Sequence, residues 1–166
     1  MAPRVRDWMT RFPITVNRRV SLLEARELMD EEQVRRLLVT DDDDALLGVV
    51  TSGDVREMWP SPVSSLSFFE RRDALDDIPI EEVMHQEPIT IHPDATIQEA
   101  ADLMFQNKIG GLPVVESGEL VGVITQSDLL RGLVRMLDEM EKNSSRTSGL
   151  TASDQASTAR SNSTSG

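Results

Sequence analysis

The sequence contains no cysteine among its 166 residues. It therefore offers no disulfide, no thiolate ligand for a metal and no cysteine nucleophile. Apolar runs are short as well, and none approaches the roughly 20 residues that a membrane-spanning helix needs. The first residues also lack the unbroken apolar stretch of a signal peptide. We therefore expect a cytoplasmic, globular protein that does not act on a membrane.

Basic residues are scarce: 17 Lys and Arg stand against 29 Asp and Glu, which gives a formal net charge of −12. This balance argues against nucleic acid as the main partner, because binding a phosphate backbone requires a basic footprint. The charge is unevenly spread, however. Residues 1–56 carry nine basic and eleven acidic side chains, whereas residues 81–142 carry four and twelve. A local basic patch in the first third is therefore compatible with an acidic chain.

The chain contains an internal repeat. Residues 9–40 align with residues 84–115 without a gap and are identical at ten of 32 positions. One residue is then lost in a turn, after which GVVTSGD (48–54) aligns with GVITQSD (122–128). The similarity keeps its register through a strand, a helix and a turn, which predicts two copies of one supersecondary unit.

Each copy has the pattern of a β-α-β-β-α unit. The predicted strands are 14–16, 37–40 and 46–50 in copy one, and 89–91, 112–115 and 120–124 in copy two. The first helix of each copy begins with a capping box, Ser21-x-x-Glu24 or Thr96-x-x-Glu99, and continues with apolar residues at helical spacing. The fold class is therefore α/β, or α+β.

The second helix of each copy is predicted to begin near Asp54 or Asp128. Pro60 ends it in copy one, because the residue before a proline disfavours helix. In copy two it continues to about Lys142. Its apolar stripe consists of Leu129, Leu130, Leu133, Leu137 and Met140.

Residues 59–82 connect the two copies. A third capping box, Ser67-x-x-Glu70, predicts a helix over 67–77. Two of the chain's four phenylalanines, Phe68 and Phe69, belong to it, which predicts that the helix packs against the repeats.

The C-terminal segment is rich in serine and threonine, and Leu150 is its one large apolar residue. Such a segment buries too little apolar surface to offset its ordering entropy, so we expect it to be disordered. The predicted organisation is copy one at 5–58, the linker at 59–82, copy two at 83–142 and the tail at 143–166.

Several motifs together resemble a known family. These are the PITV and PITI strands after a methionine, the EAxxLM helices, the segment KIGGLPVVE (108–116), and GVVTSGD and GVITQSD. The pattern resembles a tandem pair of cystathionine β-synthase (CBS) domains, or Bateman module, and is similar to small stand-alone bacterial CBS-pair proteins. The resemblance covers about residues 5–142. It implies two repeats in a pseudo-twofold arrangement, with two clefts between their sheets.

The resemblance also implies a function. Clefts of this family bind adenosine-containing ligands such as AMP, ADP, ATP or S-adenosylmethionine, and the pairs do not in general catalyse a reaction. The expected role is regulatory: a bound ligand changes the shape of the module, which signals to an unknown effector protein or across a homodimer, and no cofactor is required. The alternative is a structural dimerisation or interaction module whose clefts hold no physiological nucleotide.

The candidate clamps are Thr51-x-x-Asp54 and Thr125-x-x-Asp128. In the family interpretation, the carboxylate accepts hydrogen bonds from two ribose hydroxyls and the helix N-terminus favours phosphate. The same spacing is also a helix-capping box, which needs no ligand. The two roles can coexist, because each carboxylate has two oxygens.

The two copies differ where a phosphate would be held. Arg35–Arg36 in copy one occupy the positions of Gly110–Gly111 in copy two, and the resemblance implies that basic residues here reach the phosphates. Arginine suits this role because its planar fork binds phosphate in a bidentate manner. The alternative is that the arginines pair with Glu31–Glu32 at the surface, and that the glycines form a tight turn rather than admit a ligand.

We therefore expect the copy-one side to take a phosphorylated ligand, and the copy-two side to bind more weakly or to take a less charged adenosine derivative. The complete set of candidate ligand-binding residues is Thr15, Arg35, Arg36, Thr51, Asp54, Thr90, Gly110, Gly111, Pro113, Thr125 and Asp128.

Other polar clusters do not indicate catalysis. The aspartates 41–44 lack the spacing of a calcium loop and suit a turn between strands. His85 and His92 are separated by Pro88, and the sequence ties no carboxylate to either. Without a nucleophile–base pair or a metal cluster, we expect no metal site, no catalytic residue and no enzyme.

Overall fold

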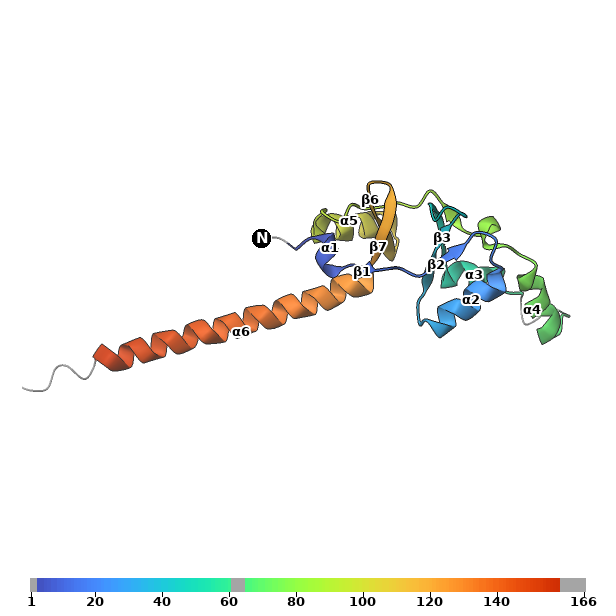
Figure 1. Cartoon of the computed structure of the whole chain (residues 1–166). Helices are drawn as coiled ribbons and strands as arrows, with labels where there is room; N and C mark the ends of the chain where they lie inside the picture. Colours follow the sequence, from blue (N-terminus) through green and yellow to red (C-terminus); the bar gives the residue numbers. More distant parts are fainter. Residues whose placement is uncertain (1–2, 61–64, 159–166) are drawn as a thin grey trace, which may run out of the picture. The chain divides into compact units, whose positions relative to one another are not determined.

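The computed structural model describes residues 3–60 and 65–158. The chain divides into two units, residues 1–126 and 127–166, each of which is described by itself. Figure 1 labels most elements of the first unit. Copy one contains β2 (Thr15–Asn17), α2 (Leu22–Glu31), β3 (Arg36–Thr40), β4 (Leu46–Thr51) and α3 (Ser52–Met58). To the first unit copy two contributes α5 (Ile97–Asn107), β6 (Gly111–Glu116), β7 (Glu119–Thr125) and Gln126, the first residue of α6 (Gln126–Thr158).

The first helix of each copy begins at its predicted capping box. The Ser21 hydroxyl accepts from the Glu24 amide at 3.1 Å, and the Ser21 amide donates to the Glu24 carboxylate at 3.0 Å. Thr96 and Glu99 repeat this exchange at 3.1 and 2.7 Å. Each box supplies partners for amides that the first turn of a helix leaves unsatisfied, which explains why α2 and α5 begin where they do.

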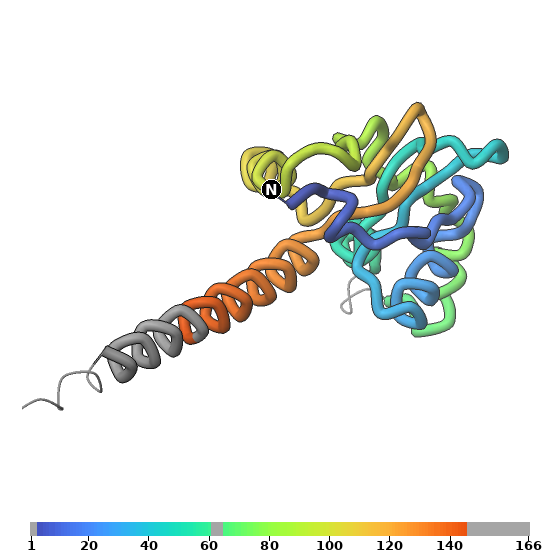
Figure 2. Tube along the Cα trace, turned by 60° about the vertical axis from the view of Figure 1, so that its left-hand side comes forward, coloured from blue at the N-terminus to red at the C-terminus, as the bar shows by residue number. Residues whose placement is uncertain are grey.

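The strands form two sheets, in the orders β2-β3-β4-β5 and β1-β7-β6. Strands β2 and β3 are parallel, and the other neighbours are antiparallel. The short strands are exchanged between the copies: β5 (His85–Gln86) of copy two pairs with β4, and β1 (Thr10–Arg11) of copy one pairs with β7. Figure 2 shows the blue N-terminal segment passing beside the orange strand β7. Each sheet is therefore completed by the other copy.

A glycine makes room for each exchanged segment. A Cβ atom at Gly48 would lie 2.7 Å from the carbonyl oxygen of His85 and 2.8 Å from the sulfur of Met84. A Cβ atom at Gly122 would lie 2.8 Å from the sulfur of Met9, with another backbone oxygen at 2.9 Å. The methionine that opens each copy thus packs on the GVV or GVI glycine of the other, which links two motifs that the sequence shows far apart.

The first strand predicted for copy two is wrong in extent. Ile91 forms a single parallel bridge to Val114, and no strand covers 89–91. In copy one the Leu38 amide donates to the Ile14 carbonyl at 3.3 Å. The equivalent of Leu38 in copy two is Pro113, which has no N–H to donate. This substitution removes one bond of the parallel ladder.

The linker is part of the hydrophobic core. The core cluster around the first sheet consists of Val16, Leu22, Ala25, Met29, Leu37, Val39, Val50, Val55, Leu75 and Ile80. Two of these come from the linker elements α4 (Phe68–Asp76) and η1 (Ile80–Glu82). The Leu22 amide donates to the Ile78 carbonyl at 2.8 Å, which attaches the end of the linker to the start of α2.

The linker helix packs against copy one, as the sequence predicts, but its phenylalanines do not provide the contact. Phe68 and Phe69 are exposed and contact each other edge to face, with ring centroids 5.9 Å apart. Leu75 is buried instead, because the linker is attached to copy one through its C-terminal half. The Ser21 hydroxyl bonds the Asp76 carboxylate at 2.9 Å in the same region.

The described part of the second unit is α6 beyond its first residue. The sequence predicts that this helix ends near Lys142, but α6 continues to Thr158. No proline interrupts residues 127–158, and adding a residue to an existing helix costs far less than nucleating one. Residues 159–166 of the predicted disordered tail lie outside the described residues. Among the helices described here, none combines the length and the apolar character that crossing a membrane would need.

Candidate ligand-binding cleft

A cleft of about 490 Å³ lies between the two copies within the first unit. Its lining residues are Arg36, Val49, Thr51, His85, Gln86, Glu87, Pro88, Ile89, Lys108, Ile109, Gly110, Gly111 and Pro113. The volume falls within the range of about 300–1,000 Å³ that is usual for small-molecule sites. The lining mixes apolar residues with a few charged and polar groups, as such sites generally do.

The cleft brings together candidate residues from both copies. Arg36 and Thr51 come from copy one, and Gly110, Gly111 and Pro113 come from copy two. In the sequence the two groups stand more than 50 residues apart. They meet because the segment that contains β5 crosses to the first sheet.

Arg36 lies against the glycine pair of the other copy. A Cβ atom at Gly110 would lie 2.6 Å from one guanidinium nitrogen of Arg36, and one at Gly111 would lie closer still to the other. The glycines therefore do permit a close approach, but the approaching group in this structure is an arginine of the protein. Lys108 lines the same cleft and adds a second positive charge.

Thr51 and Asp54 form the capping box of α3. The Thr51 amide and hydroxyl both donate to Asp54 Oδ2 at 2.7 Å, and the Asp54 amide donates to Thr51 Oγ1 at 3.3 Å. The other oxygen, Oδ1, lies 2.9 Å from His85 Nε2. One carboxylate oxygen thus caps the helix, and the second is directed toward a residue that lines the cleft.

Sequence reasoning missed His85 and the residues that follow it. The sequence ties no carboxylate to this histidine, whereas the structure pairs it with Asp54 across 31 positions of the chain. The pairing depends on β5, a strand of two residues that no local pattern indicates. The same holds for Gln86 and Glu87, since only the exchanged strand brings them to the cleft.

Other candidates lie elsewhere. Thr15 is exposed in β2, Thr90 is exposed before Ile91, and neither lines this cleft. Arg35 lines a separate cavity beside α2 and α3. Among the described residues it has no ion pair with Glu31–Glu32.

The clamp of copy two falls on the boundary between the units. Thr125 ends β7 in the first unit, and Asp128 lies in the first turn of α6 in the second. Asp128 is buried, and its Oδ1 lies 3.3 Å from an Arg131 guanidinium nitrogen. Its role toward a ligand stays a prediction.

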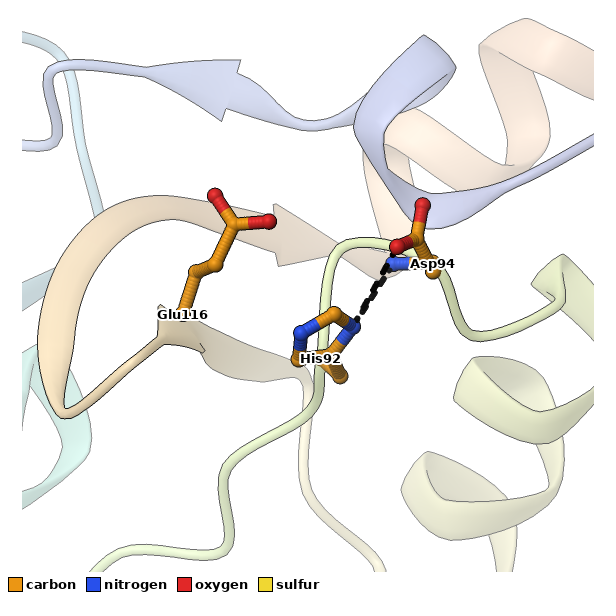
Figure 3. A group of neighbouring side chains, drawn as sticks. All are labelled: His92, Asp94 and Glu116. Atoms are coloured by element: carbon orange, nitrogen blue, oxygen red, sulfur yellow. Dashed lines mark hydrogen bonds and ion pairs between the residues drawn. The ribbon is translucent and has the colours of Figure 1, made fainter.

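A second histidine joins two carboxylates at the surface. His92, Asp94 and Glu116 place ligand atoms within 4.8 Å of one another (Figure 3). The Arg6 guanidinium pairs with Asp94 and lies 3.5 Å from Glu116, and the Asp94 amide donates to His92 Nδ1 at 3.1 Å. One guanidinium thus pairs with both carboxylates, and His92 Nδ1 accepts from a backbone amide, so the cluster is already part of a surface ion network.

The aspartate run forms a turn, as its sequence suggests. Asp41 Oδ1 accepts from the amides of Asp43 and Ala45, each at 2.9 Å. A hydrogen bond from Asn17, together with the positive charge of Arg19, holds the pKa of Asp42 below its ordinary value. Asp41 and Asp42 thus have partners within the protein.

Comparison with known proteins identifies the family. The family model of the CBS domain matches twice, at residues 5–60 and 80–135. A CBS domain-containing protein of Dictyostelium discoideum is 33% identical over 141 residues, which cover 84% of this chain and 97% of that protein. The chain belongs to the CBS domain family and is a tandem CBS pair.

Solved structures share its fold. A protein assigned to acetoin utilization in Vibrio cholerae superposes with a TM-score of 0.71 at 32% identity, covering 86% of this chain and 98% of that one. The CBS pair of protein MJ0100, solved with 5′-methylthioadenosine and S-adenosyl-L-methionine, gives 0.68 at 26% identity, with coverages of 82% and 99%. CBSX2, solved with AMP, gives 0.66 at 27%, with coverages of 80% and 97%. CBSX2 comes from Arabidopsis thaliana.

Several curated relatives are much longer than this chain. It spans 31% and 22% of two proteins of Methanocaldococcus jannaschii, the second an L-aspartate semialdehyde sulfurtransferase. It spans 23% of an inosine-5′-monophosphate dehydrogenase of Korarchaeum cryptofilum. The matched segment is thus less than a third of each of these relatives, so their activities do not define that of this chain.

Proposed function

We propose that this CBS pair is a regulatory module that binds an adenosine-containing ligand in the 490 Å³ cleft. The observation that supports this proposal is the meeting of Arg36, Lys108 and Thr51 in one cleft, together with His85, which lines the same cleft and bonds Asp54 Oδ1 at 2.9 Å. The pairs that were solved with S-adenosylmethionine, methylthioadenosine and AMP support the ligand class.

Each part of such a ligand has a suitable partner. A phosphate suits Arg36 and Lys108, because guanidinium and ammonium groups donate charge-assisted hydrogen bonds to its oxygens. A ribose suits Asp54 Oδ1, which accepts from a hydroxyl once His85 moves aside. The apolar lining, including Ile89 and Ile109, suits the faces of adenine.

Binding at this place provides a route for a signal. The cleft is lined by β4, by β5 and by the segment after α5, so a ligand contacts both copies at the exchanged strand. A ligand that displaces His85 changes the pairing that attaches β5 to copy one. We propose that this change passes to an effector protein or to a second copy, and that the module itself is not catalytic.

Thermal melting tests the ligand class. At 100 times the dissociation constant, a ligand that binds only the folded state stabilises it by about 2.7 kcal/mol. AMP, ADP, ATP, S-adenosylmethionine and methylthioadenosine are tested separately. We expect a shift with at least one, weakened by Arg36→Ala and by Asp54→Ala but retained in Arg35→Ala, whose side chain lines a different cavity. No shift with any of them would refute the proposal.

One observation favours the structural alternative. Both oxygens of Asp54 already have partners in the protein, Thr51 on one side and His85 on the other. If the carboxylate serves only the fold, Asp54→Ala lowers the stability without changing any ligand response. The melting series separates the two functions. The structural alternative predicts that Asp54→Ala melts at a lower temperature than the parent protein, and that no ligand shifts the melting temperature of the parent protein.

The second unit supports a proposed homodimer. Leu130, Leu133, Leu137 and Met140 follow the 3-4-3 spacing of a coiled-coil seam, and each is at least 49% exposed. We propose that a second copy covers this stripe. Light scattering after gel filtration is expected to give twice the chain mass of 18.5 kDa, and Leu133→Glu with Leu137→Glu to return the monomer mass. A monomer mass for the parent protein at high concentration contradicts the proposal.

A further inference from the structure

A second cavity, of about 580 Å³, lies beside α2 and α3 and shares no residue with the cleft. We propose that this cavity, here called the α2–α3 groove, binds the phosphate group of a small molecule as a site of its own. Its lining residues are Arg26, Met29, Asp30, Val34, Arg35, Ser52, Val55, Arg56, Trp59 and Pro60. All of them belong to copy one or to the start of the linker.

The charge of the groove is opposite to that of the protein. Three arginines line it against one carboxylate, in a chain whose formal net charge is −12. Among the described residues, Arg35 and Arg56 form no ion pair and no side-chain hydrogen bond that would satisfy their guanidinium groups. Planar guanidinium groups bind phosphate in a bidentate manner, so this donor set suits a phosphate.

The walls of the groove are well anchored. The guanidinium carbon of Arg26 lies 4.1 Å from the centroid of the Trp59 ring, a cation–π contact that holds both side chains. Trp59 also packs against the core cluster, and Met29 and Val55 belong to that cluster. The Ser52 amide donates to the Arg35 carbonyl at 2.9 Å, which fixes the end of β4 beside the start of β3.

The internal repeat shows that the fold does not require these arginines. By the alignment of the copies, the positions of Arg26, Arg35 and Arg56 hold Ala101, Gly110 and Leu130 in copy two. The position of Trp59 holds Leu133 in the same alignment. The same supersecondary unit thus forms with apolar or small residues at every one of these places, so the cationic set is a property of copy one and not of the fold.

Pyrophosphate is the probe for this site, because it carries the phosphate chemistry without a nucleoside. Calorimetric titration of the full chain at constant ionic strength is expected to show saturable binding. Arg35→Gln with Arg56→Gln should weaken it at least about tenfold, since hydrogen bonds between charged groups are lost. The double variant is expected to fold, because copy two carries no cation at either position. Arg19→Gln is the matched control, since it removes an exposed arginine that pairs with Asp42 outside the groove.

Three results overturn the proposal. The first is the absence of saturable pyrophosphate binding to the parent protein. The second is an equal loss of affinity in Arg19→Gln, which would show unspecific attraction. The third is unchanged binding in the double variant; if its mass in light scattering changes at the same time, the groove is the place of a second copy of the chain instead.

The outcome is independent of the proposed function. Binding of pyrophosphate in the groove is expected to persist in Arg36→Ala, whose side chain belongs to the cleft. The melting shift with an adenosine ligand is likewise expected to persist in the double variant of Arg35 and Arg56. Either site can therefore fail in these experiments while the other is retained.

Discussion

The substitution Gly48→Ala tests the exchange of strands between the copies. Its new methyl group would lie 2.7 Å from the His85 carbonyl oxygen and 2.8 Å from the Met84 sulfur. The sulfur belongs to a flexible side chain and can move, but the oxygen belongs to β5 and can move only with the strand. We therefore expect Gly48→Ala to push β5 away from β4 and to destabilise the fold.

The magnitude follows from two opposing effects. Overpacking of a filled site costs about 1–3 kcal/mol. Replacing glycine by alanine also restricts the unfolded chain, which returns about 0.4–1 kcal/mol. The expected net loss is thus about 1–2 kcal/mol in the free energy of unfolding, or roughly 2–8 °C in the melting temperature for a chain of this size.

Gly53→Ala is the matched control. The nearest atom to its new methyl group is Thr51 Oγ1 at 3.4 Å, an ordinary contact, and Gly53 is exposed in α3. Because alanine is the better helix former, this variant should be more stable than the parent by about 0.5–1 kcal/mol. Urea denaturation of both variants provides the measurement. If Gly48→Ala proves as stable as Gly53→Ala, the close contact between residue 48 and the backbone of β5 does not limit stability, and the reasoning is refuted.

Three further predictions concern the site and its surroundings. Gly111→Ala should displace the Arg36 guanidinium and weaken ADP or AMP more than methylthioadenosine, which calorimetry can measure; equal losses would argue against a phosphate role for the arginine. His85→Ala should tighten binding of an adenosine ligand, because it frees one oxygen of Asp54, and an unchanged affinity would mean that this oxygen does not contact the ligand. Hydrogen bonds from the backbone amide and then the hydroxyl of its cap residue hold the pKa of Glu99 below its ordinary value of 4.5. The stability that it contributes is therefore complete above that value and is lost as the pH falls through the lowered pKa, so the difference between the parent and Glu99→Gln in urea denaturation should shrink in acid.

The sequence predicts the local elements well, because their signals are local. The Ser21 and Thr96 capping boxes mark the starts of α2 and α5 within the residues that form them. The sequence also predicts the strands β3, β4, β6 and β7, because each is a short run of apolar residues. The sequence pattern wrongly predicts a strand at 89–91. Pro113, which has no N–H to donate to that strand, is nevertheless visible in the sequence.

The candidate site was predictable only in part. The motif and its resemblance single out Arg36, Thr51 and Asp54, but Arg35 looks equivalent to its neighbour until the structure assigns the two side chains to different cavities. His85 carries no sequence signal at all, because its partner is 31 positions away.

The sequence by itself thus determined the repeat, the family, the helix starts and the acidic balance, all of which depend on neighbouring residues or on the comparison of one copy with the other. Only the tertiary structure shows that each sheet contains a strand from the other copy. It also shows that Gly48 and Gly122 leave the space in which those strands pack. The physical reason is that strand pairing is made by backbone atoms, which every residue shares. A two-residue strand is too short to show a side-chain pattern of its own, and its distant partner cannot be read from the neighbouring residues, so the cleft that it completes is visible only once the chain has folded.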